Sequence, residues 1–204
     1  MSPPRAHPRP AVAYPGQVMS RQIHVFRSPD RFLAGTVGQP GEREFYLQVA
    51  DGTRVFSVAC EKQQVAILAD RLDKLIDEVA RRFGEQIGPS TQDDSALILT
   101  TPVDAEFRVG TMGLAWNGED AQVIVELLAM TEEEVGEDVV LEDIEEGPDA
   151  LRVFLTLAEA RDFARHADKV VSAGRPPCPL CLGPLDPHGH ICPRLNGYHR
   201  GAAS

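Results

Sequence analysis

The sequence predicts an α+β fold, in which one or more antiparallel sheets pack against two amphipathic helices. Two observations predict this class. Short segments with alternating apolar and polar residues, separated by turn residues, fill residues 22–59 and 97–155. Each region is followed by a stretch in which apolar residues recur every three or four positions, the period of a helix. The repeated order of three strands and one helix is typical of a duplicated βββα unit, although no residue-by-residue repeat accompanies it.

The first region predicts three strands joined by tight turns. The strands Arg31–Val37 and Glu44–Val49 are separated by the turn residues Gly38-Gln39-Pro40-Gly41. Asp51-Gly52, a pair that tight hairpins prefer, precedes the third strand at Thr53–Ala59. We therefore expect an antiparallel meander.

The next segment predicts the first helix. Apolar residues from Val65 to Phe83 recur at helical spacing, and charged residues lie between them. The helix is expected to end at Gly84, because glycine readily adopts the left-handed conformation found at helix C-termini.

The second region repeats this pattern. Leu97–Thr100 and Glu106–Trp116 predict strands, and Asn117-Gly118 predicts a hairpin turn. Gln122–Met130 is apolar on both faces, which indicates a central, buried strand. A further strand is expected at Leu151–Leu155.

A capping box predicts the start of the second helix. Thr156-Leu-Ala-Glu159 places a threonine at the N-cap and a glutamate three residues later. An apolar stripe from Leu157 to Val170 then predicts the buried side of the helix, which is expected to end near Gly174.

The overall composition is that of a globular protein without membrane spans. The chain has 204 residues, of which 43% are hydrophobic and 25% charged, enough for one sizeable core and a small appendage. No apolar run approaches the length of a membrane span, and the N-terminus lacks the pattern of a signal peptide. A cytoplasmic protein without membrane contact is therefore expected.

The net charge of −11 comes almost entirely from one acidic segment, residues 131–149, which holds ten acidic residues and no lysine or arginine. A solvated, partly disordered loop is the favoured interpretation. The alternatives are a docking strip for a basic partner and a weak site for divalent cations. Because the segment repels phosphates, nucleic-acid binding is disfavoured.

Three parts of the chain are expected. Residues 1–20 are rich in proline and arginine and predict a disordered extension, within which Met19 is an alternative start to Met1. Residues 21–174 form the main α+β domain, and residues 175–204 form a small tail.

The tail predicts a structural zinc site. Cys178-Pro-Leu-Cys181 places two thiols on one turn, and Cys192 follows on a second turn. Thiolates at this spacing favour tetrahedral Zn²⁺, and proline and glycine around them offer no hydrophobic core as an alternative. Because such a tail has no core of its own, metal binding and folding of the tail are expected to be one event.

The fourth ligand is expected to be His190, because His-x-Cys on a tight turn can present both donors to one metal. His188 and His199 remain alternatives. Three thiolates and one neutral imidazole give a site with a formal charge of −1, which Arg194 is well placed to offset.

No catalytic residue can be assigned from the spacing of reactive residues. Cys60 stands at a junction of strand and helix, where a small buried thiol is the favoured interpretation over a nucleophile. His24 and His166 are the histidines of the main domain, and His166 is expected to be a solvated surface residue. The glycines of Gly35–Gly41 are explained by a hairpin turn rather than by a phosphate-binding loop.

The tail sequence CPLCLGPLDPHGHICPRLNGY resembles the C-terminal signature of an uncharacterised family of actinobacterial proteins, a domain of unknown function. The stretch from Asp30 to Arg82, DRFLAGTVGQPGEREFYLQVADGTRVFSVACEKQQVAILADRLDKLIDEVARR, resembles the N-terminal half of that family. The resemblance runs from about Met19 to Tyr198. One departure is Leu182, directly after the second cysteine, where the family tends to have glycine.

The resemblance implies no established activity. Members of the family commonly occur in a trio with a phosphatidylinositol-kinase-like protein and a phosphoglycerate-mutase-type histidine phosphatase, which implies a shared pathway and these two proteins as partners. Two hypotheses follow. The favoured one is a non-enzymatic protein-interaction or adaptor module with a structural zinc site. The alternative is an enzyme or sensor that acts on a phosphorylated small molecule, which requires a pocket lined by convergent basic groups.

Overall fold

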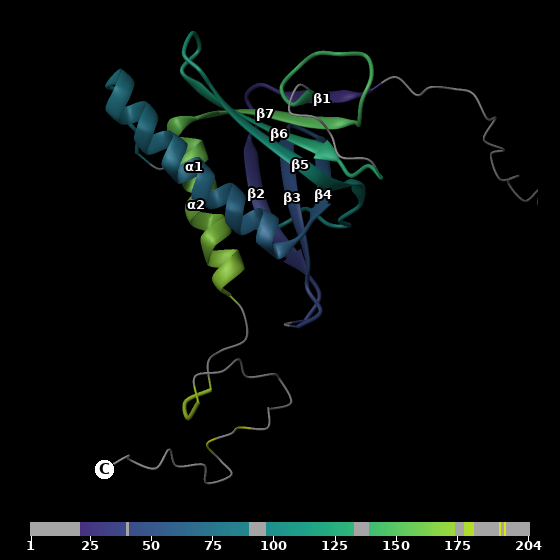
Figure 1. Ribbon diagram of the computed structural model, residues 1–204. Helices are drawn as coiled ribbons and strands as arrows, with labels where there is room; N and C mark the ends of the chain where they lie inside the picture. Colours follow the sequence, from purple (N-terminus) through teal and green to yellow (C-terminus); the bar gives the residue numbers. More distant parts are fainter. Residues whose placement is uncertain are drawn as a thin grey trace, which may run out of the picture.

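The computed structural model contains one seven-stranded sheet with two helices on one of its faces (Figure 1). The structure describes residues 21–39, 41–89, 97–132, 139–173, 178–181, 192 and 194. The elements in chain order are β1 (Ile23–Phe26), β2 (Arg31–Val37), β3 (Glu44–Asp51), β4 (Arg54–Cys60), α1 (Lys62–Phe83), β5 (Ala105–Asn117), β6 (Gln122–Ala129), β7 (Ala150–Thr156) and α2 (Leu157–Ser172). The predicted α+β class is therefore confirmed.

The strand order across the sheet is β1-β7-β6-β5-β4-β3-β2. Within each half the strands are antiparallel, as predicted, so that β2-β3-β4-α1 and β5-β6-β7-α2 repeat the same order of elements. Two pairings are parallel and were not predicted: β4 with β5 at the junction of the halves, and β1 with β7 at one edge. The pair of β4 with β5 joins the two repeats into a single sheet, and the pair of β1 with β7 extends that sheet at one edge.

Strand β5 connects the two halves. Its first residues pair with β4, where Val58 lies opposite Phe107, and the rest pair with β6 from Val109 to Asn117. The hairpin predicted at Asn117-Gly118 joins β5 to β6. One long strand thus extends both half-sheets.

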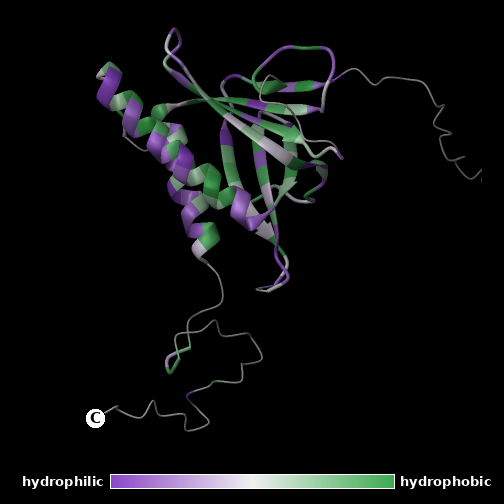
Figure 2. Ribbon diagram, viewed as in Figure 1, coloured by the Kyte–Doolittle hydropathy of each residue, from purple (hydrophilic) through white to green (hydrophobic). Residues whose placement is uncertain are grey.

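The core lies between the sheet and the helices. Apolar residues of alternate positions on the strands meet the buried stripe of α1, and Phe32 of β2 stacks on Phe163 of α2 with ring centroids 4.5 Å apart. Hydrophobic and hydrophilic bands alternate along both helices, the amphipathic pattern that places one side of each helix on the sheet (Figure 2).

The predicted helix ends are confirmed by their caps. Gly84 ends α1 in the left-handed conformation, with φ of 70°, and its N–H donates to the carbonyl of Ala80. Thr156 and Glu159 form the predicted capping box of α2, each side chain accepting from the other's backbone N–H. The helix ends at Ser172, two residues before the predicted position.

The segment 97–103 covers the face of β2 and β3 that lies opposite the helices. The prediction of a strand at Leu97–Thr100 is wrong, because the backbone of this segment bonds to a side chain instead of to a strand. The side-chain amide of Gln48 accepts from the N–H of Thr100 at 2.7 Å and donates to the carbonyl of Thr100 at 3.1 Å. Leu99 fills the space over Gly35, where a Cβ would lie 2.5 Å from its Cγ.

Residues 139–149, the longer described part of the acidic segment, cover the same face of the sheet over β5 to β7. Its anchor is Glu126, a fully buried residue of β6, whose carboxylate accepts from Arg152 at 2.7 Å and lies 3.5 Å from Arg21. Arg152 also pairs with Asp143 at 2.6 Å. Residues 142–147 are exposed, as expected of a solvated loop, yet the loop is held to the sheet by ion pairs.

Candidate metal centre

Three cysteines predicted as metal ligands lie together in the tail. The sulfur atoms of Cys178, Cys181 and Cys192 all lie within 4.8 Å of one another, and the sulfurs of Cys178 and Cys192 are 3.8 Å apart. Cys178 and Cys192 are buried, and Cys181 is partly buried. The three thiols converge on one point and are close enough to bind a metal ion.

The spacing of the sulfurs fits a tetrahedral ion with thiolate ligands. Because zinc–sulfur bonds are about 2.3 Å long, two thiolates of a tetrahedral site lie about 3.8 Å apart. The distance between Cys178 and Cys192 has this value. The three donors therefore need only small movements of their side chains to hold such an ion.

Local hydrogen bonds favour the thiolate form of Cys178. The backbone N–H groups of Cys181 and Leu180 donate toward its sulfur and lower the pKa of the Cys178 thiol, and contacts with the thiols of Cys181 and Cys192 act in the same direction. Metal ions bind the thiolate rather than the thiol, so this turn favours the ligand form of its first cysteine.

Arg194 lies against the cysteine turn. Its guanidinium donates to the carbonyl of Leu180 at 2.9 Å, which brings a positive charge to the loop between Cys178 and Cys181. This position agrees with the predicted role of Arg194 in offsetting the charge of the thiolates. The predicted fourth ligand His190 and its alternatives His188 and His199 lie outside the described residues, so the identity of that ligand stays a prediction.

The reactive residues of the main domain have structural surroundings. Burial raises the pKa of the Cys60 thiol to about 12, which keeps it protonated and unreactive, in agreement with the favoured interpretation. His24 packs on the ring of Phe56, with centroids 4.4 Å apart. The expectation of a solvated His166 is wrong: its Nε2 donates to the carbonyl oxygen of Ala34 at 2.8 Å and ties α2 to β2.

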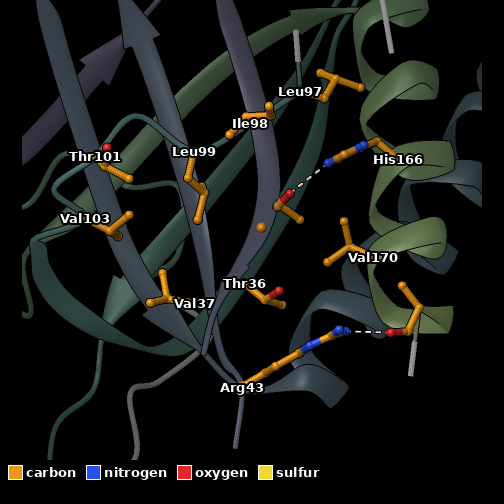
Figure 3. Close-up of a pocket in the computed structure, with 13 residues that line it drawn as sticks. Thr36, Val37, Arg43, Leu97, Ile98, Leu99, Thr101, Val103, His166 and Val170 are labelled. Carbon is orange, nitrogen blue, oxygen red and sulfur yellow. Dashed lines mark hydrogen bonds between the residues drawn. The ribbon is translucent and has the colours of Figure 1, made fainter. Parts of the chain in front are cut away.

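A pocket of about 370 Å³ lies at the edge of β2, between α2 and the segment 97–103 (Figure 3). Most of its lining is apolar, and it includes one arginine, Arg43, whose guanidinium donates to the carbonyl of Ala173, and one histidine, His166. Sequence reasoning missed this pocket because its walls come from three distant segments. The available signal was Gly35, a glycine inside a strand, which often marks a close approach of another chain segment.

Among the described residues, no helix is long and apolar enough to span a membrane. Neither a curated protein nor a solved structure matches the chain. One family model, described as a protein of unknown function (DUF3090), matches residues 24–192, which include all of the sheet but its first residue, both helices and all three clustered cysteines. The chain therefore belongs to the DUF3090 family.

Proposed function

We propose that this protein is a non-enzymatic interaction module whose tail is folded around a structural Zn²⁺ ion. The observation that carries the proposal is the convergence of three cysteine sulfurs within 4.8 Å in a short segment. The proposed ligands are Cys178, Cys181, Cys192 and His190. When bound, the ion would hold the two turns of the tail together, a structural contribution that a short segment without a core needs.

The donor set favours a structural over a catalytic ion. Three thiolates and an imidazole fill the four positions of tetrahedral zinc, whereas a catalytic ion keeps one position for water or substrate. Arg194 compensates the negative charge of the thiolates through its contact with the loop. Because the thiols must stay reduced to bind the ion, we place the protein in the cytoplasm.

The pocket beside β2 supports the choice of an interaction module over a phosphate-binding enzyme or sensor. Recognition of a phosphorylated metabolite needs several basic or polar groups that converge on one point. Arg43 is the only permanently cationic residue among the described residues that line this pocket, and the remaining described walls are largely apolar. Such a lining is better suited to side chains of a protein than to a phosphate.

The proposed partners are the phosphatidylinositol-kinase-like protein and the histidine phosphatase that accompany the family. The test has two steps. The chain is purified under reducing conditions without added metal, and elemental analysis is expected to find one zinc per chain, lost in Cys181→Ser and kept in Cys60→Ala. The tagged protein is then mixed with each purified partner and recovered. Stoichiometric recovery that Cys181→Ser abolishes supports the adaptor.

Two outcomes would contradict the proposal. A chain that folds fully and carries no zinc after reducing purification would exclude the structural site. A zinc-loaded chain that recovers neither partner at micromolar concentration would leave the metal site intact and remove the adaptor function.

A further inference from the structure

The pocket described above runs along the free edge of the sheet. Strand β2 is the last strand in the sheet order, and β3 is its one hydrogen-bonded neighbour among the described strands. Four consecutive residues of β2, Ala34 to Val37, line the pocket. Because neighbouring side chains of a strand point to opposite faces, a surface that touches all four must lie along the backbone edge itself.

The backbone at this edge has groups that point out of the sheet. The carbonyl of Ala34 accepts from His166 of α2 at 2.8 Å, so it points out of the sheet toward the helix (Figure 3). In an antiparallel pair, alternate residues direct both backbone groups to the same side, so the N–H and carbonyl of Thr36 also point outward. His166 occupies one acceptor and leaves the groups of Thr36 facing the pocket.

Two apolar walls flank this edge. One wall is the C-terminal end of α2, with Val170 and the C-cap residue Ala173. The other wall is the segment 97–103, with Leu97, Ile98 and Val103. Ile98 is 72% exposed, an unusual position for a large aliphatic side chain beside a free strand edge. An edge with walls on both sides can bind a segment that contributes backbone hydrogen bonds and apolar side chains together.

One end of the pocket is positively charged. Arg43 is the single charged residue of fixed sign among the described lining residues. Its guanidinium donates to the backbone carbonyl of Ala173 and has no carboxylate partner among the described residues. Charge complementarity therefore favours an acidic group on the occupant near Arg43.

From these observations we infer that the β2 edge binds an extended segment of a partner protein as an additional strand. The segment spans about four residues, the length of the lining stretch at about 3.4 Å per residue. It directs apolar side chains at Val170 and Ile98 and a carboxylate at Arg43. This inference rests on the proposed function in that the occupant belongs to a protein, but the site is separate from the cysteine cluster, so either can fail alone.

The test uses the ¹⁵N-labelled full chain of 22.3 kDa and two acetylated hexapeptides. One alternates valine with glutamate, and the matched control alternates valine with lysine. The acidic peptide is expected to shift the amide resonances of residues 34–37, 97–103 and 166–173, and to bind about tenfold more tightly than the basic one.

Three variants locate the site. Thr36→Pro removes the outward N–H of an edge residue, a position at which a sheet tolerates proline. Ile98→Asp changes a wall through an exposed side chain that the fold does not need. Each is expected to weaken the acidic peptide about tenfold. Ile144→Asp, another exposed isoleucine in the acidic segment, is the matched control and should bind as the parent does.

Two results would overturn the inference. Binding that is equal for both peptides, unchanged by Ile98→Asp, or undetectable at millimolar concentration would remove the groove as a strand-binding site, whatever the fate of Thr36→Pro. A dimer seen by sedimentation velocity and dissociated by Thr36→Pro would assign the edge to a second copy of the chain. Loss of zinc in Cys181→Ser without loss of peptide binding would keep this site while testing the metal separately.

Discussion

Glu126 is the residue on which the helix-free face of the sheet depends. Its side chain is fully buried, and it balances two buried arginines: Arg152, at 2.7 Å, and Arg21, at 3.5 Å. The same carboxylate accepts from the backbone N–H of Leu141 in the acidic segment. Arg21 also donates to the carbonyl of Glu142, at 2.9 Å. One carboxylate thus fixes β6, β7 and the connecting loop relative to one another.

Removing the charge of Glu126 is expected to be strongly destabilising. In Glu126→Gln the two arginines would stay buried without a full counter-charge, so the free energy of unfolding should fall by about 3 kcal/mol. Urea denaturation measures this change. The control is Glu78→Gln, which breaks an exposed pair with Arg82 and should cost less than about 1 kcal/mol. Equal losses in the two variants would show that the buried network contributes no special stability.

The Cys60 thiol is buried and is expected to be unreactive in the folded protein. Its pKa is raised by burial to about 12 from an ordinary value of 9.0, so the native thiol should not react with a disulfide reagent at pH 8. Above about pH 9 the unfolded chain loses this proton and the folded chain keeps it, so the group costs about 1.4 kcal/mol of stability per pH unit until about pH 12.

The measurement compares the parent with Cys60→Ala across pH 8 to 11. The free energy of unfolding of the parent should fall relative to that of Cys60→Ala as the pH rises, because the alanine variant lacks the titrating group. A native Cys60 that is modified as fast as the thiol of the denatured chain would contradict the assignment of a buried, protonated side chain.

The roles of residues whose partners are close in sequence could be predicted, and the roles of residues whose partners are distant in sequence could not. Cys178, Cys181 and Cys192 follow from spacing alone, because a short tail brings its own donors together. His166 could not be placed, because its partner, the carbonyl of Ala34, is 132 positions away and belongs to another element. The buried role of Glu126 was equally invisible, since it required β7 and the acidic segment to lie beside β6.

Periodicity predicted most elements because each strand and helix buries one face against the same core. The boundaries of β2 and the end of α1 agree with the structure, where a turn or a left-handed glycine ends the pattern. The prediction of a strand at Leu97–Thr100 is wrong because the apolar residues of this segment do not belong to a strand. It packs across β2 and β3, and the side chain of Gln48 satisfies its backbone.

This packing predicts a specific sensitivity of β2. In Gly35→Ala the new Cβ would lie 2.5 Å from Cγ of Leu99, so the Leu99 side chain must move and its packing on the strand is disturbed. Overpacking of this kind costs about 1–3 kcal/mol. Gly88→Ala is the matched control, since its Cβ would meet Ala158 at an ordinary 3.8 Å.

Thermal unfolding of both variants distinguishes the two cases. The melting temperature should fall in Gly35→Ala and stay near that of the parent in Gly88→Ala. Amide shifts in residues 97–103 should accompany the change in Gly35→Ala. A variant with unchanged stability and unchanged shifts would show that Leu99 does not hold the segment on the strand.

The two repeats are joined into one sheet by a strand pairing that sequence patterns do not encode. The alternation of apolar and polar residues predicts the strands of each half, but it does not predict which strand of one half pairs with which strand of the other. Parallel neighbours are not joined by a tight turn, so no turn motif in the sequence marks their pairing. The pairing of β4 with β5 therefore had to come from the structure, as did the addition of β1 beside β7. The outer edge at β2 is a consequence of that arrangement.

The main domain and the tail are stabilised in different ways. The hydrophobic core joins residues of the sheet and both helices from Phe26 to Ala167, and none of the clustered cysteines contributes to it. The buried thiols of Cys178 and Cys192 instead face each other at 3.8 Å. Burial of apolar surface therefore holds the sheet and helices together. We propose that the tail depends instead on its cysteines and the ion that they would bind.

This division predicts that the metal ligands can be removed without unfolding the main domain. Cys181→Ser is expected to release the metal and unfold the tail, because the remaining donors cannot complete a tetrahedral site. The main domain should keep its cooperative thermal transition, since its core has no contribution from the tail cysteines. Circular dichroism at the melting transition and elemental analysis measure the two parts separately, and chelation of the parent protein should reproduce the variant. If the variant or the chelated parent instead loses the whole transition, the tail belongs to the core of the fold, and the metal stabilises one domain rather than an appendage.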